Sequence, residues 1–142
     1  MVAAQASNLR SSPVSKTSPF LNACPCDSGQ SFAACCTPAL SGIWPDTALA
    51  LMRSRYCGYV LQRADYLLAS WHPDTRPSTL TFEAGLKWLG LSILASEQHE
   101  QLAFVSFRAR FRFGGGKAER LHERSRFVRL GQRWLYLDGE IS

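Results

Sequence analysis

The sequence predicts an α+β domain in which helices come first and an antiparallel sheet follows, with a small cysteine-rich module in front. Three observations lead to this prediction. Apolar residues recur at three- and four-residue steps after residue 46, they alternate with other residues after residue 86, and four of the five cysteines fall within residues 24–36. A helical period followed by a run of adjacent strands is typical of α+β proteins.

The helical part begins near Asp46 or Thr47, since either side chain is a suitable N-cap. The apolar residues that follow at helical spacing are Leu49, Met52, Tyr56, Tyr59 and Val60. We expect a second, shorter helix from a cap at Asp65 to about Trp71, where the His72–Pro73 pair ends it. Residues 73–85 contain two prolines and are expected to form a loop.

Strands follow from residue 86. Leu89, Leu91, Ile93 and Ala95 are expected on one face of the first strand, and Trp88, Gly90, Ser92 and Leu94 on the other. The second strand has the clearest alternation, with Val105, Phe107, Ala109, Phe111 and Phe113 opposite Ser106, Arg108, Arg110 and Arg112. Residues 114–117 (GGGK) predict a hairpin turn, and two more strands are expected near residues 118–130 and 134–138.

These patterns divide the chain into a disordered tail (residues 1–20), a cysteine module (21–41) and an α+β domain (42–142). The tail lacks acidic residues and apolar periodicity, which also fits a transit peptide. No apolar run reaches the roughly 18 residues that a membrane span needs. We therefore expect a cytoplasmic protein without membrane contact.

The cysteine module predicts a metal site. Cys24 and Cys26 flank Pro25, a polar turn follows, and Cys35 and Cys36 are adjacent. Clustered thiols in a reducing compartment are typical zinc ligands, and four of them leave no open position, so we expect structural Zn²⁺. We expect Ser31 to cap a short helix that ends at Cys35 and Cys36. The backbone is expected to unwind at this pair because Thr37–Pro38 follows, so that both thiolates can face one ion.

Three alternatives to this four-cysteine site compete. A disulfide between neighbouring cysteines would close a small, strained ring. Redox catalysis normally uses a Cys-x-x-Cys motif, which is absent from this sequence. Three ligands with Cys36 unused is the third alternative. The fifth cysteine, Cys57, is expected to be a small core residue.

The Cys-x-Cys-x8-Cys-Cys arrangement resembles the SEC-C motif, a zinc module. Residues 51–56 (LMRSRY), 65–67, 70–73 (SWHP), 123–127 and 133–139 resemble the body of the bacterial UPF0225 or YchJ-like proteins. This resemblance implies an NTF2-like domain, a cone of curved antiparallel sheet around helices with a pocket at its open end.

A pocket of that kind would be lined by Tyr56, Tyr59, Trp71, His72 and Tyr136, with Asp74, His122 and Glu123 as further titratable candidates. His72 and Asp74 would serve as a base and its orienting group. The alternative is structural: the tyrosines belong to the core face of a helix, and the His72–Pro73 pair only ends one.

Arginines supply a second set of candidates. Arg53 and Arg55 are candidate anion ligands on the first helix, and Arg108, Arg110 and Arg112 lie on one face of a strand. Together with Arg120, Arg124 and Arg126 on the next strand, the last three would form a basic patch suited to RNA phosphates, to a ribosome or to an acidic protein. The alternative is an exposed face that Glu119, Glu123 and Glu140 balance.

Two functions follow from these candidates. In the first, the protein is an adaptor whose zinc module docks a protein or ribosomal partner. In the second, the cone holds a small molecule, either as a binding protein or as an enzyme.

Overall fold

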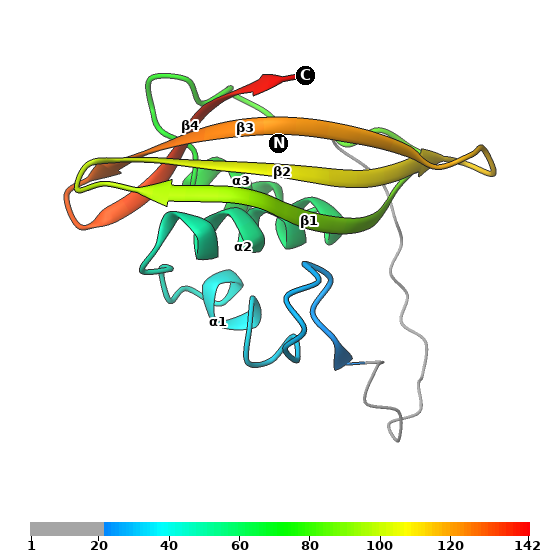
Figure 1. Cartoon of the computed structure of the whole chain (residues 1–142), viewed down its shortest axis with the longest axis horizontal. Coiled ribbons are helices and arrows are strands. Elements are labelled where there is room, and N and C mark those ends of the chain that lie inside the picture. Colours follow the sequence, from blue (N-terminus) through cyan, green and yellow to red (C-terminus); the bar gives the residue numbers. More distant parts are fainter. Residues whose placement is uncertain (1–21) are drawn as a thin grey trace.

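The computed structural model describes residues 22–142, and the predicted tail at residues 1–20 lies outside this range. Within the described part, three helices precede four strands: α1 (Thr37–Leu40), α2 (Ala48–Val60), α3 (Ala64–Ala69), β1 (Leu86–Gln98), β2 (Leu102–Phe113), β3 (Glu119–Leu130) and β4 (Arg133–Ile141). In Figure 1, α2 lies between the sheet and the cysteine-containing segment near α1. The predicted α+β order is confirmed.

The four strands form one antiparallel sheet in the order β1-β2-β3-β4, so each strand pairs with its neighbour in sequence. The alternation predicted for β2 is confirmed from Val105 to Arg110, because Val105, Phe107 and Ala109 are buried while Arg110 is exposed; Phe113, predicted on the same face, is exposed at the end of the strand. The buried side chains of β2 and β3 pack towards α2, so that one face of the sheet is an inner face and the other is an outer face.

The alternation predicted for β1 is wrong at both ends, because only Leu91 and Ile93 of the four residues predicted on one face do share a face. Leu86 and Trp88 are buried, and so is Leu91, which lies an odd number of residues further along. The pairing with β2 shifts between Trp88 and Gly90 and again between Ile93 and Ala95, and β1 contains an extra residue at each shift. One inserted residue exchanges the two faces of a strand, so Leu89 does not share a face with Leu91.

Helix α2 begins as predicted. The Thr47 side chain accepts a hydrogen bond from the Ala50 N–H at 3.1 Å. The helix is buried on nearly every side, because the sheet covers one side and the cysteine-containing segment covers the other. Its buried residues are Ala48, Leu51, Met52, Ser54, Arg55, Tyr56, Cys57, Gly58 and Tyr59.

Two details of the predicted helices are wrong. Residues 32–36 form turns and not the short helix predicted before the cysteine pair, and a helix begins only at Thr37. Pro38 lies in the first turn of α1, where a missing N–H costs no helical hydrogen bond. The N-cap of α3 is Arg63, not Asp65; Asp65 lies in the first turn and its Oδ1 forms an ion pair with Arg63 Nε at 3.0 Å.

Segments that follow the helices are tied to β4. The His72 N–H donates to the Tyr136 carbonyl at 2.8 Å, and the Tyr136 N–H donates to the Ser70 carbonyl at 2.9 Å. Trp44, in the linker before α2, donates from Nε1 to the Trp134 carbonyl at 3.0 Å. These bonds fix the position of α3 and of the linker relative to the sheet.

No helix in residues 22–142 combines the length and the apolar character that a bilayer crossing requires.

Candidate metal centre

The backbone of residues 22–36, which we call the cysteine segment, folds back on itself around the cysteines. The Cys24 N–H donates to the Gln30 carbonyl at 3.0 Å, and Ala23 forms a bridge with Ser31. Asp27 takes a left-handed backbone conformation (φ 61°), which an aspartate tolerates better than most residues. The reversal brings the first pair of thiols, which flank Pro25, over the second pair.

The second pair comes from a turn, not from a helix. The Cys35 N–H donates to the Phe32 carbonyl at 3.1 Å, which closes this turn before α1 begins. Neighbouring residues in a helix point about 100° apart, so a turn is needed for both side chains to face one point. The backbone at Cys35 and Cys36 is therefore not helical, as predicted for this pair, although a turn and not an unwound helix end supplies it.

The four sulfur atoms have the spacing of a tetrathiolate metal site. All four lie within 4.8 Å of one another; Cys26 and Cys35 are 3.6 Å apart, and Cys35 and Cys36 are 3.8 Å apart. A regular tetrahedron with metal–sulfur bonds of about 2.3 Å has edges of about 3.8 Å. Cys24, Cys26 and Cys36 are buried and Cys35 is half-buried. The donor set therefore fits a single metal ion.

The thiols of the cluster differ in pKa because they are close together. Hydrogen bonding from Cys24, and then from Cys36, lowers the pKa of Cys26. Hydrogen bonding with Cys24 and Cys26 raises the pKa of Cys36. Burial is the main reason that the pKa of Cys35 is raised. Thiols this close ionise together only when a positive charge among them offsets their mutual repulsion.

Cys57 also reaches this cluster, which sequence reasoning missed. Its Sγ lies 3.6 Å from Cys24 Sγ, and its side chain is fully buried on α2. Cys57 belongs to the core, as predicted, but to the part of the core that touches the thiols. The sequence held one indication of this contact, because Arg53 and Cys57 are four residues apart and therefore share a face of the predicted helix. In the structure both residues contact the cysteine segment.

Arg53 joins the cysteine segment to α2. Its Nη1 donates to the Cys26 carbonyl at 2.8 Å and lies 3.6 Å from Cys26 Sγ. A guanidinium beside a set of thiolates offsets part of their charge. Arg53 was predicted to bind an anion, but in the structure its guanidinium contacts a carbonyl oxygen and a sulfur of the same chain.

Asp27 joins the cysteine segment to the sheet. Its Oδ2 accepts a hydrogen bond from the Leu91 N–H at 3.1 Å, next to the irregularity in β1. A Cβ atom on Gly90 would lie 3.0 Å from this carboxylate oxygen, so a residue without a side chain suits the contact. The cysteine segment is therefore held against both layers of the body.

Most of the five residues predicted to line a pocket are buried side chains of the core. Tyr56, Tyr59, Trp71 and Tyr136 are each less than 10% exposed. The rings of Trp71 and Tyr136 are in edge contact, with centroids 5.1 Å apart. Burial raises the pKa of Tyr59 to about 12, which keeps its phenol neutral.

Arg55 occupies the middle of this group. Its guanidinium is fully buried and stacks on Tyr136 (4.5 Å to the ring centroid) and on Trp71 (5.0 Å). Its Nη1 donates to the Leu67 carbonyl at 2.9 Å and to Ser70 Oγ at 2.6 Å. Arg55 therefore completes the core between the helices and β4 and does not face solvent as Arg53 partly does.

The acid–base candidates are dispersed. His72 Nδ1 accepts a hydrogen bond from the Asp74 N–H at 3.0 Å, so this nitrogen is occupied by the backbone and not by the Asp74 carboxylate, which is 3.8 Å away. Glu123 is buried and accepts from Ser125 Oγ at 2.7 Å and from the Tyr136 hydroxyl at 3.3 Å. His122 lies on the outer face of the sheet, opposite Arg108.

The fold and this cluster define a class: an NTF2-like α+β domain preceded by a cysteine module that is consistent with a SEC-C motif. Residues 47–139 match the family model described as the YchJ middle NTF2-like domain. The chain belongs to this family, whose members include the UPF0225 proteins.

Relatives and a solved structure agree with this assignment. A UPF0225 protein of Polaromonas naphthalenivorans is 54% identical over 77% of this chain and 81% of its own length. A UPF0225 protein of Bordetella parapertussis is 50% identical over 84% of this chain and 92% of its own length. The solution structure of a SEC-C motif containing protein from Rhodopseudomonas palustris is 35% identical, with a TM-score of 0.74, over 82% of this chain and 96% of that one.

Proposed function

We propose that the protein is a zinc-binding adaptor in which Zn²⁺, held by Cys24, Cys26, Cys35 and Cys36, shapes a docking surface for a protein partner. The observation that carries the proposal is the tetrahedral spacing of the four sulfur atoms. Thiolates favour Zn²⁺ among the common divalent ions because they are soft ligands. Similarity to the Rhodopseudomonas palustris protein, which contains a SEC-C motif, supports the same ion.

The role proposed for the ion is structural. Four protein ligands complete a tetrahedron, so no position remains for a substrate or a reactive water. The segment around the thiols has little regular secondary structure apart from turns and the four-residue α1. In a segment of this kind, binding free energy of the metal is largely folding free energy. We also propose that the protein works in the cytoplasm, where thiols stay reduced.

A hollow beside the thiols is the proposed docking surface. It has a volume of about 260 Å³ and lies between the cysteine segment and the start of α2. Its lining is mostly apolar and includes Ala34, Cys35, Thr47, Leu49 and Arg53. An apolar hollow of this kind fits an apolar side chain of a short peptide segment, while the Arg53 guanidinium stays bound to the cysteine segment. The ion would fix this surface by fixing Cys35 and Cys36.

The alternative, a small-molecule site inside the cone, has weaker support. The aromatic side chains proposed to line it are buried against one another, and the guanidinium of Arg55 stacks between two of them. Opening a cavity there would require this buried group to move.

The first test is metal content. Protein purified under reducing conditions is expected to contain one zinc per chain by native mass spectrometry, and Cys36→Ser is expected to lose it. Protein that keeps residues 22–41 ordered without any bound metal would refute the zinc site.

The second test separates docking from zinc binding. Leu49→Arg would fill the hollow while leaving all four thiols in place, whereas Leu130→Arg changes a 52% exposed residue away from the hollow. We expect Leu49→Arg to keep its zinc but to lose the partners that the unaltered protein retains in quantitative co-purification, and Leu130→Arg to keep both. If Leu49→Arg retains every such partner, the docking role is wrong even though the zinc site stands.

A further inference from the structure

The outer face of the sheet carries a group of cations at the end nearest the β2–β3 turn. We call this group the cationic end; its members are Lys87, Arg108, Arg110, Arg112 and Arg120. Arg110 stands directly opposite Arg120 across β2 and β3, and Lys87 stands opposite Arg112 across β1 and β2. The positive charges are therefore adjacent across the strands as well as along them.

These arginines have no partner within the described part of the chain. No ion pair or side-chain hydrogen bond of residues 22–142 involves Arg108, Arg110, Arg112 or Arg120, and Arg112 Nε is shielded from solvent without an acceptor. Like charges directly opposite one another in a sheet are destabilising. Folding alone therefore gives no reason for this arrangement.

Two acidic residues lie near the cationic end but do not neutralise it. Asp27 reaches the edge of β1 close to Arg110, where its carboxylate already accepts the Leu91 N–H. Glu119 stands opposite Phe111 and so belongs to the rows of the inner face. The cationic end keeps an excess of positive charge.

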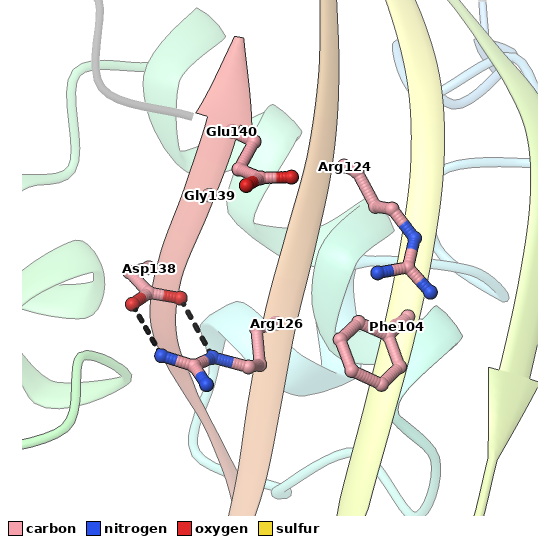
Figure 2. Close-up of a pocket in the computed structure, with 6 residues that line it drawn as sticks. All are labelled: Phe104, Arg124, Arg126, Asp138, Gly139 and Glu140. Atoms are coloured by element: carbon pink, nitrogen blue, oxygen red, sulfur yellow. Dashed lines mark hydrogen bonds and ion pairs between the residues drawn. The ribbon is translucent and has the colours of Figure 1, made fainter.

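The other end of the same face is different, as Figure 2 shows. Arg126 forms a two-pronged ion pair with Asp138 (2.9 and 2.7 Å). Arg124 lies over the Phe104 ring (3.9 Å to the centroid) and 3.6 Å from Glu97. A shallow hollow of about 260 Å³ separates these groups. Each arginine at this end has a partner, so we call it the paired end.

We propose that the cationic end binds the phosphate backbone of a nucleic acid, without reading its sequence. Guanidinium groups match phosphate oxygens in pairs, and arginines on adjacent strands repeat about every 5 Å across a sheet, which suits a polymer with regularly spaced charges. No aromatic residue belongs to the cationic end, so it lacks a platform for stacking bases. Contacts to phosphates alone give affinity without sequence selectivity.

This proposal is independent of the adaptor function, because it uses the face of the sheet that is turned away from α2 (Figure 1), although Asp27 of the cysteine segment reaches the edge of β1 close to Arg110. Nothing in it requires zinc or the hollow beside the thiols. Failure of one proposal leaves the other intact.

The test is the salt dependence of binding to a fluorescent oligouridine, measured by anisotropy with the zinc-loaded full chain. Each phosphate contact to a single strand contributes about 0.7 to the slope of log affinity against log salt. The triple variant Arg108→Gln/Arg110→Gln/Arg120→Gln removes three contacts. We expect the slope to fall by about 2, and the affinity at about 50 mM salt to fall at least tenfold.

A charge-matched control is Arg63→Gln/Arg76→Gln/Arg133→Gln. These arginines lie at the start of α3, in the loop after it and at the β3–β4 turn, so the variant loses the same charge away from the cationic end. It is expected to keep the original slope to within about one phosphate contact. Equal losses in both triple variants would mean that only net charge matters and would overturn the proposal.

Two further measurements test whether the loss of binding reflects destabilisation of the fold and whether the surface binds acidic protein instead of nucleic acid. Arg120→Glu places opposite charges across β2 and β3, so it should weaken binding without lowering the melting temperature. Binding loss that accompanies a lower melting temperature would count against a surface role. Polyglutamate is expected to compete poorly with the oligouridine; competition at equal charge concentration would show that the surface takes acidic protein instead, and the proposal would fail.

Discussion

The cysteine segment and the sheet are stabilised by different means, although they are in contact. In the sheet, apolar side chains such as Phe107, Phe127 and Trp134 are fully buried. The cysteine segment has half-buried or exposed residues on both sides of its thiols, and what it buries is chiefly sulfur. Burial of apolar surface stabilises the sheet, whereas the cysteine segment depends on the proposed metal ion that would hold its four thiols together. The comparison predicts that the sheet and the cysteine segment unfold in response to different changes.

Metal removal should have the largest effect, and it should be confined to the cysteine segment. Structural zinc contributes on the order of 10–16 kcal/mol to small zinc modules. After treatment with a chelator, or in Cys36→Ser, we expect protease cleavage within residues 22–41 while the sheet keeps its near-ultraviolet circular dichroism. Loss of both signals in one step would show that the two regions form a single cooperative unit.

A cavity in the sheet should have the converse effect. Phe107→Ala removes a ring that is 0% exposed, at a cost of about 3–5 kcal/mol. We expect a lower midpoint of urea unfolding with one zinc still bound in the folded protein. Phe113→Ala is a matched control, because this ring is 45% exposed and should cost under about 1 kcal/mol. Zinc loss from Phe107→Ala below its unfolding midpoint would contradict the separation of the two regions.

How far sequence reasoning succeeds follows the same division between local and distant contacts. The Thr47 cap, the alternation along β2 and the thiol cluster depend on residues close in sequence, and each was predictable. The placement of Cys57 against Cys24 joins residues 33 positions apart, and no local pattern encodes it.

Two other features were missed for physical reasons that can be stated. The irregularity at Gly90 is a single inserted residue, and the Asp27 carboxylate that occupies it comes from 64 residues away. The burial of Arg55 contradicts the usual exposure of a cation, because its charge is accommodated by a carbonyl, a hydroxyl and two ring faces. Neither feature leaves a trace in composition or period.

Arg53 connects the cysteine segment to the body of the protein, and its loss should have an intermediate effect on metal affinity. Arg53→Gln removes the donor to the Cys26 carbonyl and the cation near its sulfur. Loss of a group that orients a metal ligand typically lowers metal affinity 10- to 100-fold. We expect a fall of about that size in competition with a chromophoric chelator, with the fold of the sheet unchanged. Arg126→Gln, which breaks the exposed ion pair with Asp138 on the sheet, should leave the affinity unaltered; an equal fall there would attribute the effect to net charge.

The smallest effect is expected at Cys57, which touches the thiols but belongs to the core of the body. Its sulfur lies 3.6 Å from Cys24 Sγ, whereas the four proposed ligands are all mutually close. Cys57→Ala should therefore keep one zinc at unchanged affinity and lose about 1 kcal/mol of stability. Cys35→Ala, which removes the half-buried thiol, should release the metal. The opposite outcome, zinc lost with Cys57 but kept without Cys35, would move the fourth ligand onto α2 and make the metal a joint between the two regions.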